Sequence, residues 1–266
     1  MLVDRGLDLG SAWVAGSPVA WLSANGERPR GHGDDADGWH DGWSGGLVTT
    51  CGLQNVGAAS EGHGRHGRYS ELAASEVAVE RRVDADGTGE LVVSGTIVEP
   101  VALGRGIRVR RRIVFAIGTP TVRIEDDAVN ESASTLQAPL LYHVNVGHPF
   151  LDPETRLLLG DDAVPGRAMG PPMEAADEVV EHPAFGVAAL ESAALGLRLD
   201  LRWDADTMPR LFTWQRRVPG QYVMAVEPAN CSVAGRAADR RAGVASMLEP
   251  DAQRRTTLTL AFSPRS

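Results

Sequence analysis

Short segments with alternating apolar and polar residues recur along most of the chain and predict β-strands. In residues 196–203, Leu197, Leu199 and Leu201 fall on one face and charged residues occupy the positions between them. Residues 257–262 repeat the pattern, with leucine or phenylalanine at every second position. Because side chains alternate between the two faces of a strand, each segment predicts a strand with one buried face. Turn residues bound most of these segments, which favours an antiparallel arrangement.

Further strands are expected where short segments are rich in β-branched residues or alternate in polarity, at 91–98, 107–117, 121–125 and 222–226. Helical signals are weak: residues 71–79 fit either a short helix or a loop followed by a strand. No linker divides the chain into blocks of different composition, so residues 1–266 are expected to form a single domain. The sequence therefore predicts an all-β, antiparallel sandwich or barrel with few short helices.

The amino-acid composition agrees with this fold class and indicates where in the cell the protein is expected. The chain has 30 glycines and 16 prolines, an excess that favours turns over a helical bundle. No apolar run approaches the ~18 residues of a membrane span, and the first residues do not resemble a signal peptide. Two cysteines, Cys51 and Cys231, are too few for a disulfide framework. We therefore expect a cytoplasmic protein with no membrane partner.

The charged residues exclude several kinds of chemistry. All 26 basic residues are arginine, so lysine Schiff bases, covalent pyridoxal phosphate and a phosphate-binding P-loop lysine are excluded. A formal net charge of −9 argues against a nucleic-acid partner. The basic run at residues 105–112 is expected to be the solvated face of a strand.

The most informative segment is Leu140–Phe150. As a strand, it places His143 and Asn145 on one face, about 7 Å apart, and Tyr142, Val144 and Val146 on the other. The second face is an ordinary core face. The first combines an imidazole with a carboxamide, and both would need partners in a dry core. A polar cleft on one sheet face is the economical explanation, with His143 as a general acid or base; the alternative is a histidine with no role beyond packing.

A second candidate is Glu227, which ends the apolar segment 221–226 just before Pro228. Proline removes the next amide donor and ends the strand ladder. A carboxylate at the end of a buried strand is where a raised pKa and a general base are expected. The alternative is a rim carboxylate paired with an arginine such as Arg216 or Arg217.

Two loops carry further candidates. Residues 62–70 hold His66 and Arg68 among glycines, a composition suited to hydrogen bonding with a hydroxylated ligand. The Gly-x-Gly-x-x-Gly pattern there follows no strand, so it does not predict a dinucleotide site, and no metal spacing is complete. Residues 23–46 form a long polar loop with Trp39 and Trp43, and loops of this length are typically functional or disordered.

Trp214, in the segment 211–215, could stack on a sugar face; the alternative is a core or rim aromatic residue. Together these segments resemble the aldose 1-epimerase-like branch of the galactose-mutarotase superfamily. The resemblance rests on an ordered set of segments: Asp4–Asp8, Gly45–Leu53, His66–Arg68, Tyr142–Asn145 with His148–Pro149, and Tyr222–Asn230.

The resemblance implies an antiparallel β-supersandwich with a sugar site on one sheet face and no metal or cofactor. It implies that His143 is the general acid, that Glu227 is the general base, and that His66 binds sugar hydroxyls. A sugar would be the partner, and the activity would be interconversion of anomers. We expect the two catalytic groups to line one cleft roughly 5–8 Å apart, with the pyranose ring between them.

The chain also departs from the family pattern. Val144-Asn145 stands where the family has an aromatic pair after its histidine. Asn145, on the same strand face as His143, is a substrate-binding candidate. The family Gly-Arg-x-x-Asn motif is absent, and Arg5 or Arg68 could substitute for its arginine. Asp152 is a candidate for the substrate-binding aspartate. Little sequence precedes Asp4, so a family strand is expected to be missing, and the edge it leaves could pair in a homo-oligomer.

Two other functions stay open at this point. A non-catalytic carbohydrate-binding protein would keep the aromatic, histidine and arginine contacts without an acid–base pair. A sugar-phosphate epimerase would use the abundant arginines to hold a phosphate.

Overall fold

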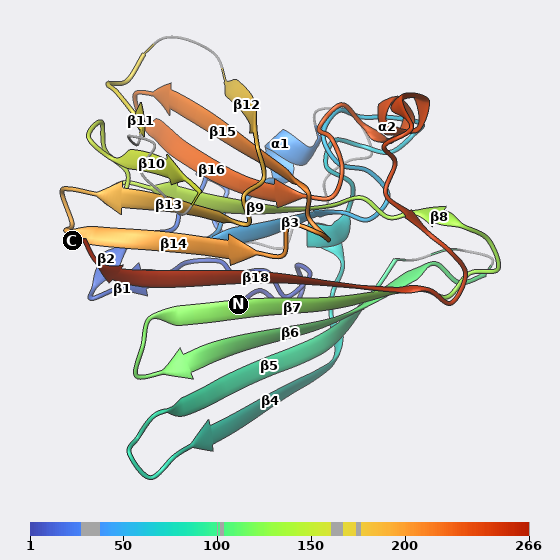
Figure 1. The fold of residues 1–266 in the computed structure, drawn as a ribbon, viewed down its shortest axis with the longest axis horizontal. Coiled ribbons are helices and arrows are strands. Elements are labelled where there is room, and N and C mark those ends of the chain that lie inside the picture. The colour runs from blue at the N-terminus through green and yellow to red at the C-terminus, as the bar shows by residue number, and fades with distance from the viewer. Residues whose placement is uncertain (28–37, 100, 102–103, 161–166, 174–176, 266) are drawn as a thin grey trace.

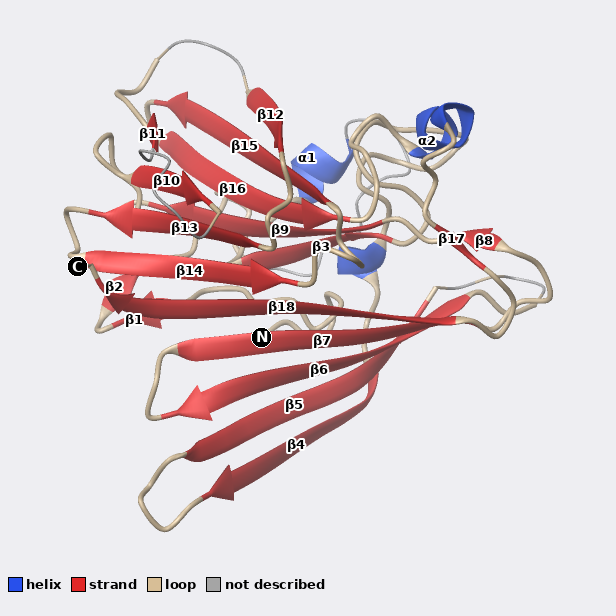
Figure 2. Cartoon of the chain, viewed as in Figure 1, coloured by secondary structure: helices blue, strands red, loops and turns tan. Residues whose placement is uncertain are grey.

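Two antiparallel sheets stack to form the molecule (Figure 1). The computed structural model describes residues 1–27, 38–99, 101, 104–160, 167–173 and 177–265. The larger sheet has nine strands in the order β11-β10-β13-β14-β18-β7-β6-β5-β4, and the smaller has five in the order β12-β15-β16-β9-β3. Figure 2 shows that helices are few and short. This is the β-sandwich predicted from the sequence.

The strands of the larger sheet are β4 (Ser75–Val83), β5 (Gly89–Val98), β6 (Ile107–Ile117), β7 (Thr121–Asn130), β10 (Arg156–Leu159), β11 (Arg167–Ala168), β13 (Val187–Ser192), β14 (Leu197–Trp203) and β18 (Gln253–Pro264). Those of the smaller sheet are β3 (Val48–Gly52), β9 (Leu140–Gly147), β12 (Glu178–His182), β15 (Arg210–Val218) and β16 (Gln221–Ala229). Two small ladders pair β1 (Trp13–Val14) with β2 (Ser17–Pro18) and β8 (Leu136–Gln137) with β17 (Met247–Leu248). The helices are α1 (Gly38–Gly42), the 3₁₀ helix η1 (Tyr69–Glu71) and α2 (Arg236–Ala242).

The main core lies between the two sheets. Leu199 and Leu201 of β14 and Leu258 and Leu260 of β18 are fully buried there, as their alternation predicts. The doubtful segment 71–79 is a loop followed by β4 rather than a helix. None of the helices in the described part of the chain is long and apolar enough to span a membrane.

The central strand β9 separates two environments, and all eight of its residues are buried. Tyr142, Val144 and Val146 point into the core between the sheets. His143 and Leu141 lie on the opposite face, where a second, smaller cluster contains Trp39 and Trp43. The polar positions of β9 therefore lie on the outer face of the five-stranded sheet, beneath α1 and the loops that cover it.

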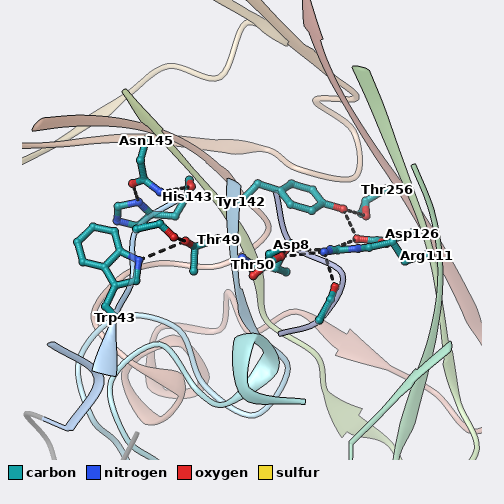
Figure 3. A network of polar contacts seen from close by, with 12 residues as sticks. Asp8, Trp43, Thr49, Thr50, Arg111, Asp126, Tyr142, His143, Asn145 and Thr256 are labelled. Atoms are coloured by element: carbon teal, nitrogen blue, oxygen red, sulfur yellow. Dashed lines mark hydrogen bonds and ion pairs between the residues drawn. The ribbon is translucent and has the colours of Figure 1, made fainter. Parts of the chain in front are cut away.

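The expectation that the whole basic run 105–112 is solvated is wrong at Arg111, which is 1% exposed. Arg111 faces the core, where it contacts Asp8 at 2.9 Å and Asp126 at 2.6 Å and donates to Thr50 (Figure 3). A buried guanidinium is tolerable because both carboxylates neutralise it and its donors find acceptors. Tyr142 donates to Asp126 as well, so the network reaches the core face of β9.

Candidate functional site

His143 and Glu227 lie side by side on the outer face of the five-stranded sheet. Their strands β9 and β16 are neighbours, and Val144 pairs with Val226, so the register places the two side chains directly opposite each other. Nε2 of His143 lies 3.1 Å from Oε1 of Glu227, and both residues are buried. The expected separation of 5–8 Å is therefore wrong: adjacent pairing leaves no room for a sugar ring between them.

Asn145 fixes the tautomer of the histidine ring. Its Nδ2 donates to the carbonyl oxygens of Gly46 and His143, at 2.8 and 2.9 Å, so its Oδ1 is identified as the acceptor. That oxygen contacts Nδ1 of His143 (Figure 3), and Nδ1 must therefore carry a proton. In the neutral ring, Nε2 is then an unprotonated acceptor that faces Glu227.

An acceptor nitrogen and a carboxylate oxygen 3.1 Å apart need a proton between them. Oε1 of Glu227 has no well-aligned donor within the described protein, although it is buried. Burial raises the pKa of Glu227 to about 8 and lowers the pKa of His143 to about 4. The pair thus holds one proton at neutral pH, and burial favours its residence on Glu227.

Aromatic rings surround His143. The ring centroids of Trp43, Trp214 and Trp39 lie 5.0, 5.7 and 6.1 Å from that of His143. Trp43 Nε1 donates to Thr49 Oγ1 at 3.2 Å, which anchors the indole to β3. These walls keep the pair away from bulk water, which is the cause of both pKa shifts.

His66 is the third predicted residue that joins this site. The loop that carries it is tied to the end of β3, because Gly52 N–H donates to the His66 carbonyl at 2.9 Å. The His66 ring lies 4.6 Å from Trp39 and 6.1 Å from His143, and its burial lowers its pKa well below the usual range. His66, His143, Asn145, Trp214 and Glu227 therefore share one face of the sheet.

Three other sequence candidates contact different groups. Arg68 lies 3.8 Å from Glu99, a buried carboxyl whose pKa burial raises to about 7. Arg5 is buried and donates to the Gly42 carbonyl at the end of α1, so it supports the cover of the site. Asp152 accepts hydrogen bonds from its own turn, at Glu154 N and Thr155 Oγ1. Their roles in substrate binding stay predictions.

A cavity of about 450 Å³ is lined by Trp43 and Trp214, the two indoles that contact the His143 ring. It continues past Trp21 to Arg216 and Gln221 at the β15–β16 turn. A second cavity, of about 670 Å³, lies on the other side of Trp21 and is lined by Asp152 among others. Trp43 and Trp214 thus separate the acid–base pair from the first cavity.

The sequence did not single out Trp21 as a site residue, and it placed Trp39 and Trp43 only in a long loop. The available signal was the occurrence of large aromatic residues in polar, glycine-rich stretches, which have no core to bury them. Within the described residues, no group of three or more histidine, cysteine, aspartate or glutamate side chains is arranged to hold a metal ion.

The two stacked sheets form a β-sandwich whose fold is shared with proteins named as aldose 1-epimerases and mutarotases. A protein from Klebsiella pneumoniae subsp. pneumoniae MGH 78578, named "putative aldose 1-epimerase", superposes with a TM-score of 0.85 at 19% identity, covering 99% of this chain and 76% of that one. A protein of the same name from Escherichia coli K12 gives 0.62 at 13% identity (98% and 94% covered). A "putative mutarotase" from Salmonella typhimurium gives 0.65 at 16% (98% and 85%).

The sequence itself gives the family. A family model described as a domain of unknown function, DUF4432, matches residues 1–262, and the chain belongs to this family. A search of curated proteins found no match. At the identities above, the structural likeness establishes the fold alone.

Proposed function

We propose that this protein is a carbohydrate isomerase of the aldose 1-epimerase type, which interconverts the anomers of a reducing sugar. The observation that carries the proposal is the buried His143–Glu227 pair, which holds one proton on the outer sheet face. The fold shared with proteins named as aldose 1-epimerases supports it.

The reaction needs one acid and one base at neighbouring atoms. The base removes the proton of the anomeric hydroxyl while the acid protonates the ring oxygen, and the bond between the anomeric carbon and the ring oxygen breaks. The aldehyde rotates, and closure reverses both proton transfers. Both oxygens are bonded to the same carbon, so two groups 3.1 Å apart can serve them from one side of the sugar.

The resting pair must redistribute its proton before it acts in the roles expected from the family resemblance. Transfer of the Glu227 proton to Nε2 of His143, across the 3.1 Å contact, converts the neutral pair into an imidazolium and a carboxylate. His143 is then the acid and Glu227 the base. Asn145 Oδ1 keeps the Nδ1 proton in place during this transfer, so the ring exchanges protons through Nε2 only.

Substrate must displace part of the aromatic cover. Trp39, on the five-residue helix α1, stacks on Trp43 at 4.6 Å and lies against His66 at the same distance. A sugar that replaces the Trp39 ring would meet His66 and the acid–base pair together. The remaining indoles would exclude water, which strengthens the electrostatic contacts of the pair.

The rate at which the anomers of a sugar interconvert tests the proposal directly. Anomer interconversion is measured by NMR exchange or polarimetry over a panel of aldoses, with buffer alone as the reference. We expect activity that His143→Ala and Glu227→Gln each reduce by about 100-fold or more, while Glu80→Gln, an exposed carboxyl on β4, leaves it unchanged. Circular dichroism checks that the variants fold.

Two outcomes would contradict the proposal. Calorimetric binding of sugars without any turnover would indicate a carbohydrate-binding protein. Wild-type rates equal to those of buffer, with no sugar binding, would exclude a carbohydrate function of this site.

A further inference from the structure

Four of the six tryptophans of the chain gather at one place on the outer face of the five-stranded sheet. Trp43 contacts Trp39, Trp21 and Trp214, with ring centroids 4.6, 4.9 and 5.5 Å apart. The acid–base pair needs only the part of this surface that covers His143. Trp21 and the far side of Trp214 extend beyond it, along the cavity of about 450 Å³.

The register of β15 and β16 gives the direction of this extension. Phe212 pairs with Glu227, Trp214 with Ala225, and Arg216 with Val223, so Trp214 and Arg216 follow each other along the face that carries Glu227. Arg216 is four positions along β15 from Phe212, the residue that pairs with Glu227, which corresponds to about 14 Å of strand. Ala225 and Val223, which pair with Trp214 and Arg216, are buried on the same face. The stretch of sheet from Glu227 to Arg216 is therefore longer than a single pyranose ring, and the cavity lies over its far part, at Trp214, Arg216 and Gln221.

The far end of the cavity is polar, and its two charged residues among those that the structure describes, Arg216 and Asp177, pair with each other. Arg216 binds Asp177 at 2.7 Å and donates to the Gln221 side chain at 2.7 Å, so its positive charge is already balanced. Such an end favours neutral hydroxyl groups over a phosphate or a carboxylate, because an anion would have to compete with Asp177 for the guanidinium. An amide and an ion pair equally disfavour a purely apolar group.

We propose that this cavity is a subsite for a second sugar unit, so that the substrate class is a reducing disaccharide or longer neutral oligosaccharide. The reducing unit lies over His143 and Glu227, and the next unit lies in the cavity against Trp43 and Trp214, with Trp21 as its outer wall. Indole rings pack against the C–H faces of a pyranose, while Gln221 and Arg216 lie within reach of its hydroxyl groups. This inference rests on the proposed function of the same site.

The test compares each monosaccharide with the disaccharide that it terminates: glucose with maltose and cellobiose, xylose with xylobiose, and galactose with galactobiose. Glucose 6-phosphate is the anionic probe. We expect a kcat/KM for anomer exchange about tenfold or more higher for at least one disaccharide than for its monosaccharide. Trp21→Ala and Gln221→Ala should each remove most of that difference, and Gln221→Ala should change the monosaccharide value less than twofold.

Trp13→Ala is the matched control, since Trp13 is 62% exposed and does not line this cavity. Gln221 is exposed at the strand end, so its variant retains the fold even if Trp21→Ala does not. Equal kcat/KM values for every pair, a preference for glucose 6-phosphate, or variants that lower both substrates equally would each overturn the subsite.

Failure of the proposed function gives a different result. If no sugar is turned over, calorimetric titration with the same disaccharides still decides the subsite. Disaccharide binding that Trp21→Ala and Gln221→Ala weaken would support it, and absence of disaccharide binding would overturn it.

Discussion

The shared proton of the buried pair has a consequence for stability that Glu227→Gln isolates. In the unfolded chain the two groups have their ordinary pKa values, 4.5 for glutamate and 6.5 for histidine; in the folded protein burial moves them to about 8 and about 4. The raised pKa of Glu227 stabilises the folded protein at low pH, and this contribution is lost as pH rises toward 8. The lowered pKa of His143 acts oppositely and costs stability as pH falls from 6.5 to 4.

Between pH 4.5 and 6.5 the unfolded chain binds one proton, on His143, and the folded protein also binds one, on Glu227, so the pair gives no slope. Between pH 6.5 and 8 only the folded protein binds a proton. The free energy of unfolding should therefore fall by about 1.4 kcal/mol per pH unit, or about 2 kcal/mol in all.

Glu227→Gln removes the raised carboxyl and leaves the histidine. The free energy of unfolding of the variant, minus that of the wild type, should then rise steadily from pH 4.5 to 8, by about 5 kcal/mol in total. Other titrating groups, including Glu99, are common to both proteins and cancel in this difference. Urea unfolding at pH 5, 6, 7 and 8 measures it. A difference that does not change with pH would mean that Glu227 is ionised in the folded protein, and the argument for a shared proton would fail.

Three further outcomes are expected. The kcat/KM for anomer exchange should be flat between about pH 4 and 8 and fall outside that range, where the pair gains a second proton or loses its only one; a rate that keeps rising above pH 9 would contradict it. Asn145→Ala should lower kcat by up to about 100-fold because Nδ1 loses its acceptor, whereas an unchanged kcat would refute the tautomer assignment. Arg111→Met should lower the free energy of unfolding, measured in urea, by about 3–5 kcal/mol, because it leaves Asp8 and Asp126 buried without their cation. Its control, Arg112→Met at an exposed position, should lower it by less than about 0.5 kcal/mol. Equal losses in the two variants would refute the role of the network.

The alternation along β9 predicted which residues share a face, because side-chain direction in a strand depends only on position. His143 and Asn145 lie together on one face, and Tyr142, Val144 and Val146 lie on the other, as the sequence indicated. Strand pairing was not predictable in the same way. That β9 is the neighbour of β16 depends on contacts across 84 residues, which the sequence does not show. The expected 5–8 Å came from placing a sugar ring between the histidine and the glutamate, and the structure gives 3.1 Å instead.

The same limit explains Arg111. Arg111 shares a strand face with Ile107, Val109 and Ile113, which are all buried. The alternation alone therefore places the arginine in the core. One of its partners, Asp8, lies 103 residues earlier in the chain. The burial of a charge can be predicted only when its counter-charges are known, and only the folded structure brings these together.

The Asp8–Arg111–Asp126 network and the His143–Glu227 site meet across β3 and β9, and this shared position links stability to the candidate site. Thr50 of β3 binds Asp8 and Arg111 on the core face, while its neighbour Thr49 accepts the Trp43 indole on the outer face (Figure 3). On β9, Tyr142 lies on the core face and donates to Asp126, whereas His143 lies on the outer face and contacts Glu227. The buried charges thus hold β3 and β9 in place on their core face, and the acid–base pair and its indole neighbours lie on the outer face of the same two strands.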